Sequence, residues 1–189
     1  MAVIAYQYRG DLVDQIHRGH IAVTDHTGRI LWKLGDPERL TFARSSAKPL
    51  QAIPVAESGA LEHYGITPQE LAVICSSHNG EPFHVKAVES ILHKAGLSPD
   101  QLCCGAEYPM YVPAEDALKI AGIPRAPIYC DCSGKHAGML ITAHHFGESL
   151  ENYTALEHPV QQRILSVFAE MCGVETSEVQ LAVDGCGVP

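Results

Sequence analysis

Short apolar runs, each followed by a loop of small and reactive residues, recur along this chain and limit the folds it can adopt. Three such loops cover residues 44–48, 76–81 and 132–136, and residues 184–186 form a candidate fourth. Binding and catalytic residues concentrate on loops that a rigid scaffold holds in place. We therefore take these loops as the candidate functional site.

The first loop contains a Ser-x-x-Lys motif, formed by Ser45 and Lys48, directly before a segment of helical pattern. A serine hydroxyl is a poor nucleophile at neutral pH, and a nearby lysine in its neutral form can act as its base. Positions i and i+3 share one face of a helical turn, which would let these side chains meet. The motif also recurs by chance, so a capping serine and a solvated lysine remain the alternative.

The periodicity of apolar residues predicts a mixture of strands and helices. Residues 3–32 have the pattern of strands and turns, with a hairpin around the polar turn 25–28. Further strands are predicted at residues 40–43, 71–75 and 179–183. Helices are predicted over residues 50–58, 83–95, 114–121, 137–145 and 157–172, with a short helix after the capping signature 67–70.

The composition excludes several classes of protein. The 189 residues suffice for one domain, and a net charge of −9 without a basic stripe argues against nucleic acid as a partner. No apolar run is long enough to span a membrane, and the N-terminus lacks the pattern of a signal peptide. An odd count of seven irregularly spaced cysteines favours free thiols in a reducing compartment. We therefore expect a cytoplasmic protein.

Four strings of residues together carry a resemblance to a known family. They are residues 43–49 (ARSSAKP), 76–81 (SSHNGE), 132–136 (CSGKH) and 184–187 (DGCG). Their order and separation resemble the bacterial L-asparaginase II family of the Rhizobium etli inducible type, over essentially the whole chain. The resemblance implies an α+β fold similar to serine β-lactamases and penicillin-binding enzymes, with helices packed on an antiparallel sheet. It also implies that residues 1–189 are a single domain, the N-terminal part of a longer family domain whose sheet is incomplete here.

The same resemblance implies an enzyme that hydrolyses the side-chain amide of L-asparagine to L-aspartate and ammonia. Its catalytic centre would use two serine–lysine pairs. The first corresponds to Ser45 and Lys48, and the serine of the second corresponds to Ser77. The lysine of the second pair would lie beyond Pro189. The expected partner is therefore a small-molecule substrate, L-asparagine, and a homodimer is left open.

Cysteines in two of the loops are candidates for a metal site. The resemblance implies a zinc position formed by Cys132, Lys135 and Cys186. Residue chemistry alone favours buried thiols instead, because a lysine must lose its proton before it can bind a metal. The remaining cysteines near these positions, Cys103, Cys104 and Cys130, are predicted to serve packing.

The roles of three further side chains stay open at this stage. Arg44 is a candidate for binding the substrate carboxylate, because its planar guanidinium matches that group, and a surface ion pair is the alternative. His78 is a candidate substrate-binding residue, and a structural histidine bonded to the backbone is the alternative. Ser77 is either a proton relay or the nucleophile itself.

Two other functions are compatible with these residues. The Ser45–Lys48 pair would also suit a β-lactamase-like peptidase or esterase, since those enzymes use the same motif. The chain would alternatively be a zinc-binding fragment without activity. Ammonia release from L-asparagine separates the first interpretation from both alternatives.

Overall fold

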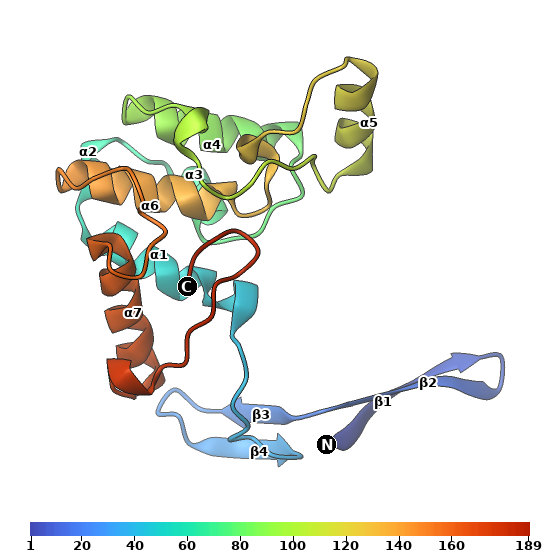
Figure 1. Cartoon of the computed structure of the whole chain (residues 1–189). Coiled ribbons are helices and arrows are strands. Elements are labelled where there is room, and N and C mark those ends of the chain that lie inside the picture. Colours follow the sequence, from blue (N-terminus) through green and yellow to red (C-terminus); the bar gives the residue numbers. More distant parts are fainter. The chain divides into compact units, whose positions relative to one another are not determined.

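The computed structural model describes all 189 residues, which form two compact units, residues 1–42 and residues 43–189 (Figure 1). The regular elements of the first unit are all strands, and those of the second are all helices. The α+β class predicted from the sequence is confirmed. The strands form two separate antiparallel pairs rather than one sheet covered by helices.

The first unit consists of two antiparallel strand pairs. Strand β1 (Ala2–Arg9) pairs with β2 (Leu12–Gly19), and β3 (Ile21–Thr24) pairs with β4 (Ile30–Leu34). The predicted hairpin around residues 25–28 is confirmed, and Asp25 holds its turn by accepting a hydrogen bond from the Thr27 N–H at 2.9 Å. Many apolar side chains of these strands are exposed, among them Tyr8, Leu12 and Trp32.

The second unit is a cluster of helices arranged around one buried helix. Its seven α-helices are α1 (Lys48–Glu57), α2 (Ala60–His63), α3 (Pro68–Ile74), α4 (Pro82–Lys94), α5 (Val112–Ile120), α6 (Ser133–His145) and α7 (Pro159–Cys172). Single 3-10 turns, η1 to η4, cover Arg44–Ala47, Pro99–Gln101, Pro127–Tyr129 and Thr176–Glu178. The predicted helices correspond to α1, α4, α5, α6 and α7, with ends shifted by a few residues.

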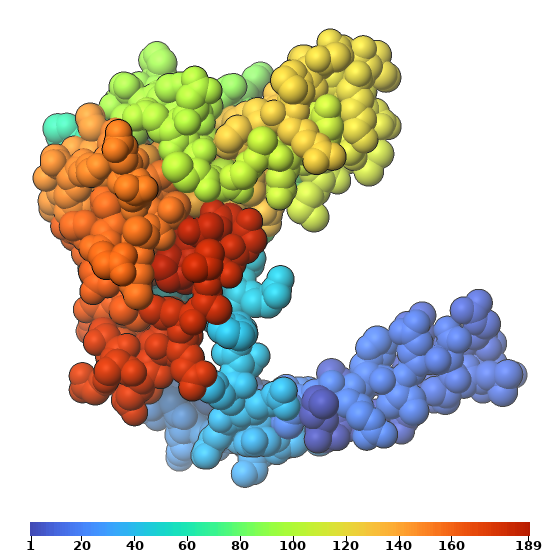
Figure 2. All heavy atoms as spheres, in the orientation of Figure 1, coloured from blue at the N-terminus to red at the C-terminus, as the bar shows by residue number.

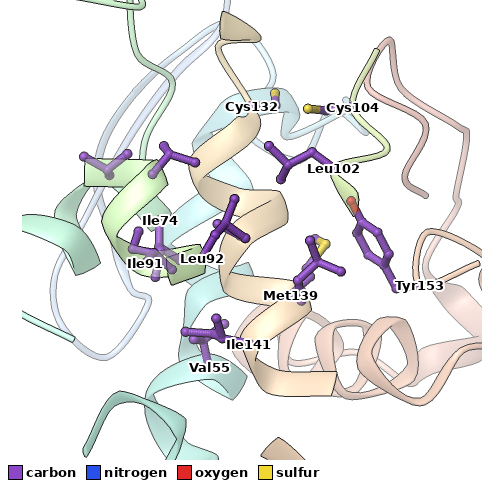
Figure 3. Close-up of a cluster of buried hydrophobic side chains, with 14 of the residues drawn as sticks. Val55, Ile74, Ile91, Leu92, Leu102, Cys104, Cys132, Met139, Ile141 and Tyr153 are labelled. Carbon is purple, nitrogen blue, oxygen red and sulfur yellow. The ribbon is translucent and has the colours of Figure 1, made fainter. Parts of the chain in front are cut away.

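Helix α6 is the centre of the core, because every residue from Ser133 to Ala143 is buried. In Figure 3, Ile91 and Leu92 of α4 lie on one side of this helix, and Leu102 and Tyr153 lie on the other. Each large apolar side chain buried in this way stabilises the fold by about 1.5–3 kcal/mol. The N-terminal end of α6 carries Cys132 and Lys135, so the core fixes part of the candidate site.

The predicted strand at residues 71–75 is wrong, because residues 71–74 belong to helix α3 and Cys75 is its C-cap residue. Thr67 caps this helix: its hydroxyl accepts a hydrogen bond from the Glu70 N–H at 3.3 Å, and the Glu70 carboxylate accepts one from the Thr67 N–H at 2.6 Å. The capping box therefore continues directly into the apolar run. A short apolar run fits a buried helix and a buried strand equally well, and here the capping box decides.

The strands predicted at residues 40–43 and 179–183 are also wrong. Both segments are irregular, and neither has a neighbouring strand with which to pair. Alternation of apolar residues stabilises a strand only where a partner accepts its backbone hydrogen bonds. The segment after Val179, red in Figure 2, instead packs back against the helical unit, where Val188 is buried and Cys186 contacts Lys135.

Helix α6 approaches α3 so closely that only glycine fits at the contact. A Cβ atom at Gly134 would lie 2.4 Å from the Val73 carbonyl oxygen. We therefore expect Gly134→Ala to lower the free energy of unfolding by roughly 3 kcal/mol, measured by urea denaturation, because a backbone atom must move. Gly185→Ala is the matched control and should cost less than about 0.5 kcal/mol, since nothing lies within 4 Å of its Cβ position. Equal losses in both variants would contradict the close contact.

Candidate active site

Ser45 and Lys48 are placed by the turn η1 and the first turn of helix α1. Pro49 follows immediately, where the helix loses no hydrogen bond to it because first-turn N–H groups have no partner. Lys48 has helical dihedral angles (φ −57°, ψ −39°) although a proline follows it. Its side chain is buried, with 2% exposed, whereas Ser45 is exposed. The Lys48 amine is therefore buried, whereas the Ser45 hydroxyl is accessible to a substrate.

The three predicted catalytic side chains form one continuous hydrogen-bonded chain. Lys48 Nζ donates to Ser77 Oγ at 2.5 Å, and Ser77 Oγ donates to Ser45 Oγ at 3.2 Å. No direct hydrogen bond joins Lys48 to Ser45, although the spacing of the motif had suggested one. The amine reaches Ser45 through Ser77, which comes from the loop after α3. The structure thus brings together two loops that lie about thirty residues apart in the sequence.

His78 lies in the same loop as Ser77 but makes only internal bonds. Ser133 Oγ donates to the Ile128 carbonyl at 3.1 Å, so it accepts from His78 Nε2 at 2.8 Å. The Gly80 N–H donates to His78 Nδ1 at 3.1 Å. These partners select the neutral tautomer with the proton on Nε2. Burial, followed by the proximity of His84, lowers the pKa of His78 to about 4. Both ring nitrogens are occupied, which favours the structural role over substrate binding.

Arg44 is exposed beside Ser45 and forms no ion pair. Its backbone has a positive φ of 51°, a conformation that costs a non-glycine residue about 1–3 kcal/mol. Strained residues of this kind cluster at functional sites, where the surrounding structure holds them in place. The surface ion-pair alternative for Arg44 finds no partner in this structure, and the guanidinium is accessible to a ligand.

The three candidate metal ligands converge at the N-terminal end of α6. Cys132 is the N-cap residue of this helix, and Lys135 lies in its first turn. Lys135 Nζ lies 3.0 Å from Cys186 Sγ and 3.3 Å from Asp184 Oδ2. The two cysteines and the lysine are all buried, with exposed fractions between 4% and 7%. Cysteine sulfur is a donor that zinc prefers, whereas a lysine nitrogen binds a metal only after losing its proton.

A model of the family described as L-asparaginase II matches residues 5–189, nearly the whole chain. The chain belongs to the L-asparaginase II family. Membership supports a hydrolase, an asparaginase, as the class of enzyme, and a small molecule as its substrate. No curated protein matches the chain. No helix here combines the length and the apolar character that crossing a membrane requires.

In this L-asparaginase II chain the sequence reasoning missed Asp184. Its Oδ1 accepts a hydrogen bond from the Cys186 N–H at 2.8 Å, and its Oδ2 contacts the Lys135 ammonium. Asp184 thereby holds the terminal turn against α6. A signal was present, because this acid stands two residues before Cys186 in the same motif. A buried lysine also requires a carboxylate or thiolate partner nearby.

The two clusters influence each other electrostatically. Hydrogen bonds from the Cys130 and Cys186 thiols lower the pKa of Cys132, and the Lys48 and Lys135 side chains act in the same direction. Burial opposes the charged form of Lys135, but its contact with Cys186 raises the pKa of this lysine overall. Cys132 is therefore the sulfur most ready to bind a cation. A metal would have to displace protons from Lys135 and Cys186.

Proposed function

We propose that this chain hydrolyses the side-chain amide of L-asparagine, releasing L-aspartate and ammonia through an acyl-enzyme. One observation carries the proposal beyond family membership. A buried amine, Lys48, connects through the hydroxyl of Ser77 to the exposed hydroxyl of Ser45. Such a series of hydrogen bonds can remove a proton from an accessible nucleophile without exposing the base to water.

In the acylation step, Ser45 Oγ attacks the carbonyl carbon of the side-chain amide. Its proton passes to Ser77 Oγ as the Ser77 proton passes to neutral Lys48. After this transfer, Lys48 donates a hydrogen bond to Ser77, and Ser77 donates one to the oxygen of Ser45. The structure has the same donors and acceptors. The same route returns the proton to the departing nitrogen as the C–N bond breaks. The products are ammonia and an aspartyl ester on Ser45.

In the deacylation step, water attacks the ester and gives its proton to Lys48 through Ser77. The ester C–O bond breaks as the proton returns to Ser45 Oγ, which releases aspartate and restores the enzyme. One amine and one relay hydroxyl thus serve both halves of the reaction. If Ser77 were the nucleophile instead, Lys48 would accept the Ser77 proton directly, because the two atoms lie 2.5 Å apart. Ser45 would then take no part in this proton transfer.

Substrate orientation would come from groups beside the reacting atoms. The exposed Arg44 guanidinium suits the α-carboxylate of asparagine, because its planar fork matches two carboxylate oxygens. The Ser77 N–H has no hydrogen-bond partner in the backbone, which makes it a candidate donor to the oxyanion. The Ser-x-x-Lys chemistry is shared with serine β-lactamases, and we propose that the family domain shares their architecture.

A zinc ion would be held by Cys132, Lys135 and Cys186. The fit rests on the convergence of these buried donors, and it agrees with the hydrogen bonds from Cys130 and Cys186 that lower the pKa of Cys132. When bound, zinc would supply a cross-link between the segments that hold it. Without it, the Lys135 ammonium already bridges Cys186 and Asp184, so this chain's own charges hold the terminal turn. A cytoplasmic location and a homodimer remain predictions.

The proposal is tested by measuring ammonia release from L-asparagine by the purified chain, beside turnover of a chromogenic ester and a β-lactam. We expect ammonia from asparagine and slow turnover, at most, of the other substrates. Rapid ester or lactam cleavage without ammonia would replace the proposal with a peptidase or esterase. Turnover of none of them would favour the inactive zinc-binding fragment.

A further inference from the structure

A closed arm that carries helix α5 extends from the helical unit. Residues 107–126, which we call the α5 arm, begin and end at an antiparallel bridge, where Glu107 and Ala126 exchange backbone hydrogen bonds at 3.1 and 3.3 Å. Figure 1 shows α5 set apart from the other helices, and none of its residues is buried. Pro109 is the only buried residue of the arm. The arm therefore adds little to the core, and the surroundings of Pro109 indicate what it does.

Pro109 packs against the loop that carries Ser77. A Cβ atom at Gly80 would lie 2.7 Å from Pro109 Cβ and 2.9 Å from its Cα, so only glycine allows this approach. Gly80 also has a φ of 72°, in the left-handed region that glycine tolerates best. Further along the arm, the Tyr111 N–H donates to the Asn79 carbonyl at 2.8 Å. The arm thus holds two consecutive residues of the loop, one by packing and one by a backbone hydrogen bond.

Backbone hydrogen bonds extend this restraint to His78. Its N–H donates to the Asp131 carbonyl at 3.1 Å, and its Nδ1 accepts from the Gly80 N–H at 3.1 Å. Ser77 itself forms no backbone–backbone hydrogen bond. The position of Ser77 is therefore set from both sides, by helix α3 before it and by the restrained residues 78–80 after it.

We propose that the α5 arm positions Ser77 for proton transfer, with Pro109 and the Tyr111 N–H as the positioning groups. The inference rests on the proposed function. Both groups act through the backbone of residues 79–80. Ser77 must accept from Lys48 at 2.5 Å and donate to Ser45 at 3.2 Å at the same time. A displacement of about 1 Å can lower a rate roughly 10²-fold, so this relay depends on a well-held loop.

The place of the arm in the fold predicts that it affects turnover more than substrate binding or stability. Arg44, the candidate group for the substrate carboxylate, lies on a different segment, the turn η1. Loosening the loop should therefore lower kcat and leave KM nearly unchanged. Global unfolding should also change little, because the arm buries no residue other than Pro109.

Pro109→Gly tests this inference, with Pro124→Gly as the matched control. Pro124 is an exposed proline of the same arm, so both variants gain similar backbone freedom, and only Pro109→Gly loses the contact with Gly80. We expect kcat for ammonia release from L-asparagine to fall roughly 10–100-fold in Pro109→Gly, with KM within about threefold of the wild type. Pro124→Gly should retain the wild-type kcat. The two variants should have similar midpoints of urea denaturation.

Hydrogen exchange followed by mass spectrometry provides a readout that does not depend on activity. The backbone amides of residues 78–80 should exchange faster in Pro109→Gly than in the wild type or in Pro124→Gly. Tyr111→Pro replaces Pro109→Gly if the latter does not fold. It removes the N–H that binds Asn79, and the Tyr111 φ of −74° already suits proline. The same loss of kcat and the same faster exchange are expected.

Equal kcat in Pro109→Gly and Pro124→Gly would overturn the inference, as would unchanged exchange of residues 78–80. A loss of kcat together with a much lower denaturation midpoint would also overturn it, because the contact would then be merely structural. A wild type that releases no ammonia rejects the proposed function alone. The exchange rates then decide whether the arm holds the loop.

Discussion

Replacing Ser45 with alanine is expected to lower kcat for ammonia release from L-asparagine by roughly 10⁴-fold or more. The substitution removes the oxygen that forms the acyl-enzyme and leaves Lys48 hydrogen-bonded to Ser77. Ser45 is exposed, so its loss creates no cavity, and the free energy of unfolding should change by less than about 0.5 kcal/mol. Saturating-substrate kinetics and urea denaturation of the same preparation provide both measurements.

The adjacent serine is the matched control for this experiment. The Ser46 hydroxyl donates to the Ala43 carbonyl and forms no hydrogen bond with Lys48 or Ser77. Ser46→Ala should therefore retain kcat within a few-fold of the wild type. Retention of the full rate by Ser45→Ala would refute its assignment as the nucleophile.

A comparison with Ser77 decides which hydroxyl reacts. If Ser77 is the relay, Ser77→Ala and the double variant should be about as inactive as Ser45→Ala, because residues that act as a unit are not additive. Mass spectrometry of peptides from an enzyme trapped with a slow ester substrate should place the acyl group on Ser45. An acyl group on Ser77 would reverse the two roles.

The candidate site illustrates what could be predicted from the sequence. The order of the four motifs indicated that Ser45, Lys48 and Ser77 belong together, and the structure brings them within hydrogen-bond distance. The route of contact could not be predicted. Spacing within a motif fixes only neighbours on one helical turn, whereas the position of Ser77 depends on how the loop after α3 packs.

The same limit explains the other differences from the sequence predictions. The ring of His78 is fixed by Ser133, 55 residues away, so its role could be read only from the folded chain. The run 71–75 became helical up to residue 74 because its buried environment suits either conformation and the Thr67 cap lies directly before it. Helix α6 was predicted from residue 137, but it begins at Ser133, inside the segment that the sequence had indicated as a loop.

Replacing Lys48 with methionine is expected to lower kcat by roughly 10³–10⁴-fold or more while keeping the protein folded. Methionine matches the length of the lysine side chain and suits a site that is 2% exposed, but it cannot accept a proton. Exchanging a buried amine for an apolar group of similar size removes the cost of burying a polar group, against the loss of one hydrogen bond to Ser77 worth about 0.5–1.5 kcal/mol. Activity and stability should therefore change independently, as kinetics and urea denaturation would show.

Lys48→Arg separates the loss of a base from the loss of a positive charge. Arginine keeps the charge and can donate to Ser77, but it does not release its proton in proteins. If Lys48 acts as the base, Lys48→Arg should be about as inactive as Lys48→Met. If the lysine only supplies positive charge beside Cys132, arginine should preserve most of the rate. Substantial activity in Lys48→Arg would therefore reject the proton-transfer role of Lys48 and support an electrostatic one. The reason is that arginine keeps the positive charge but cannot accept a proton.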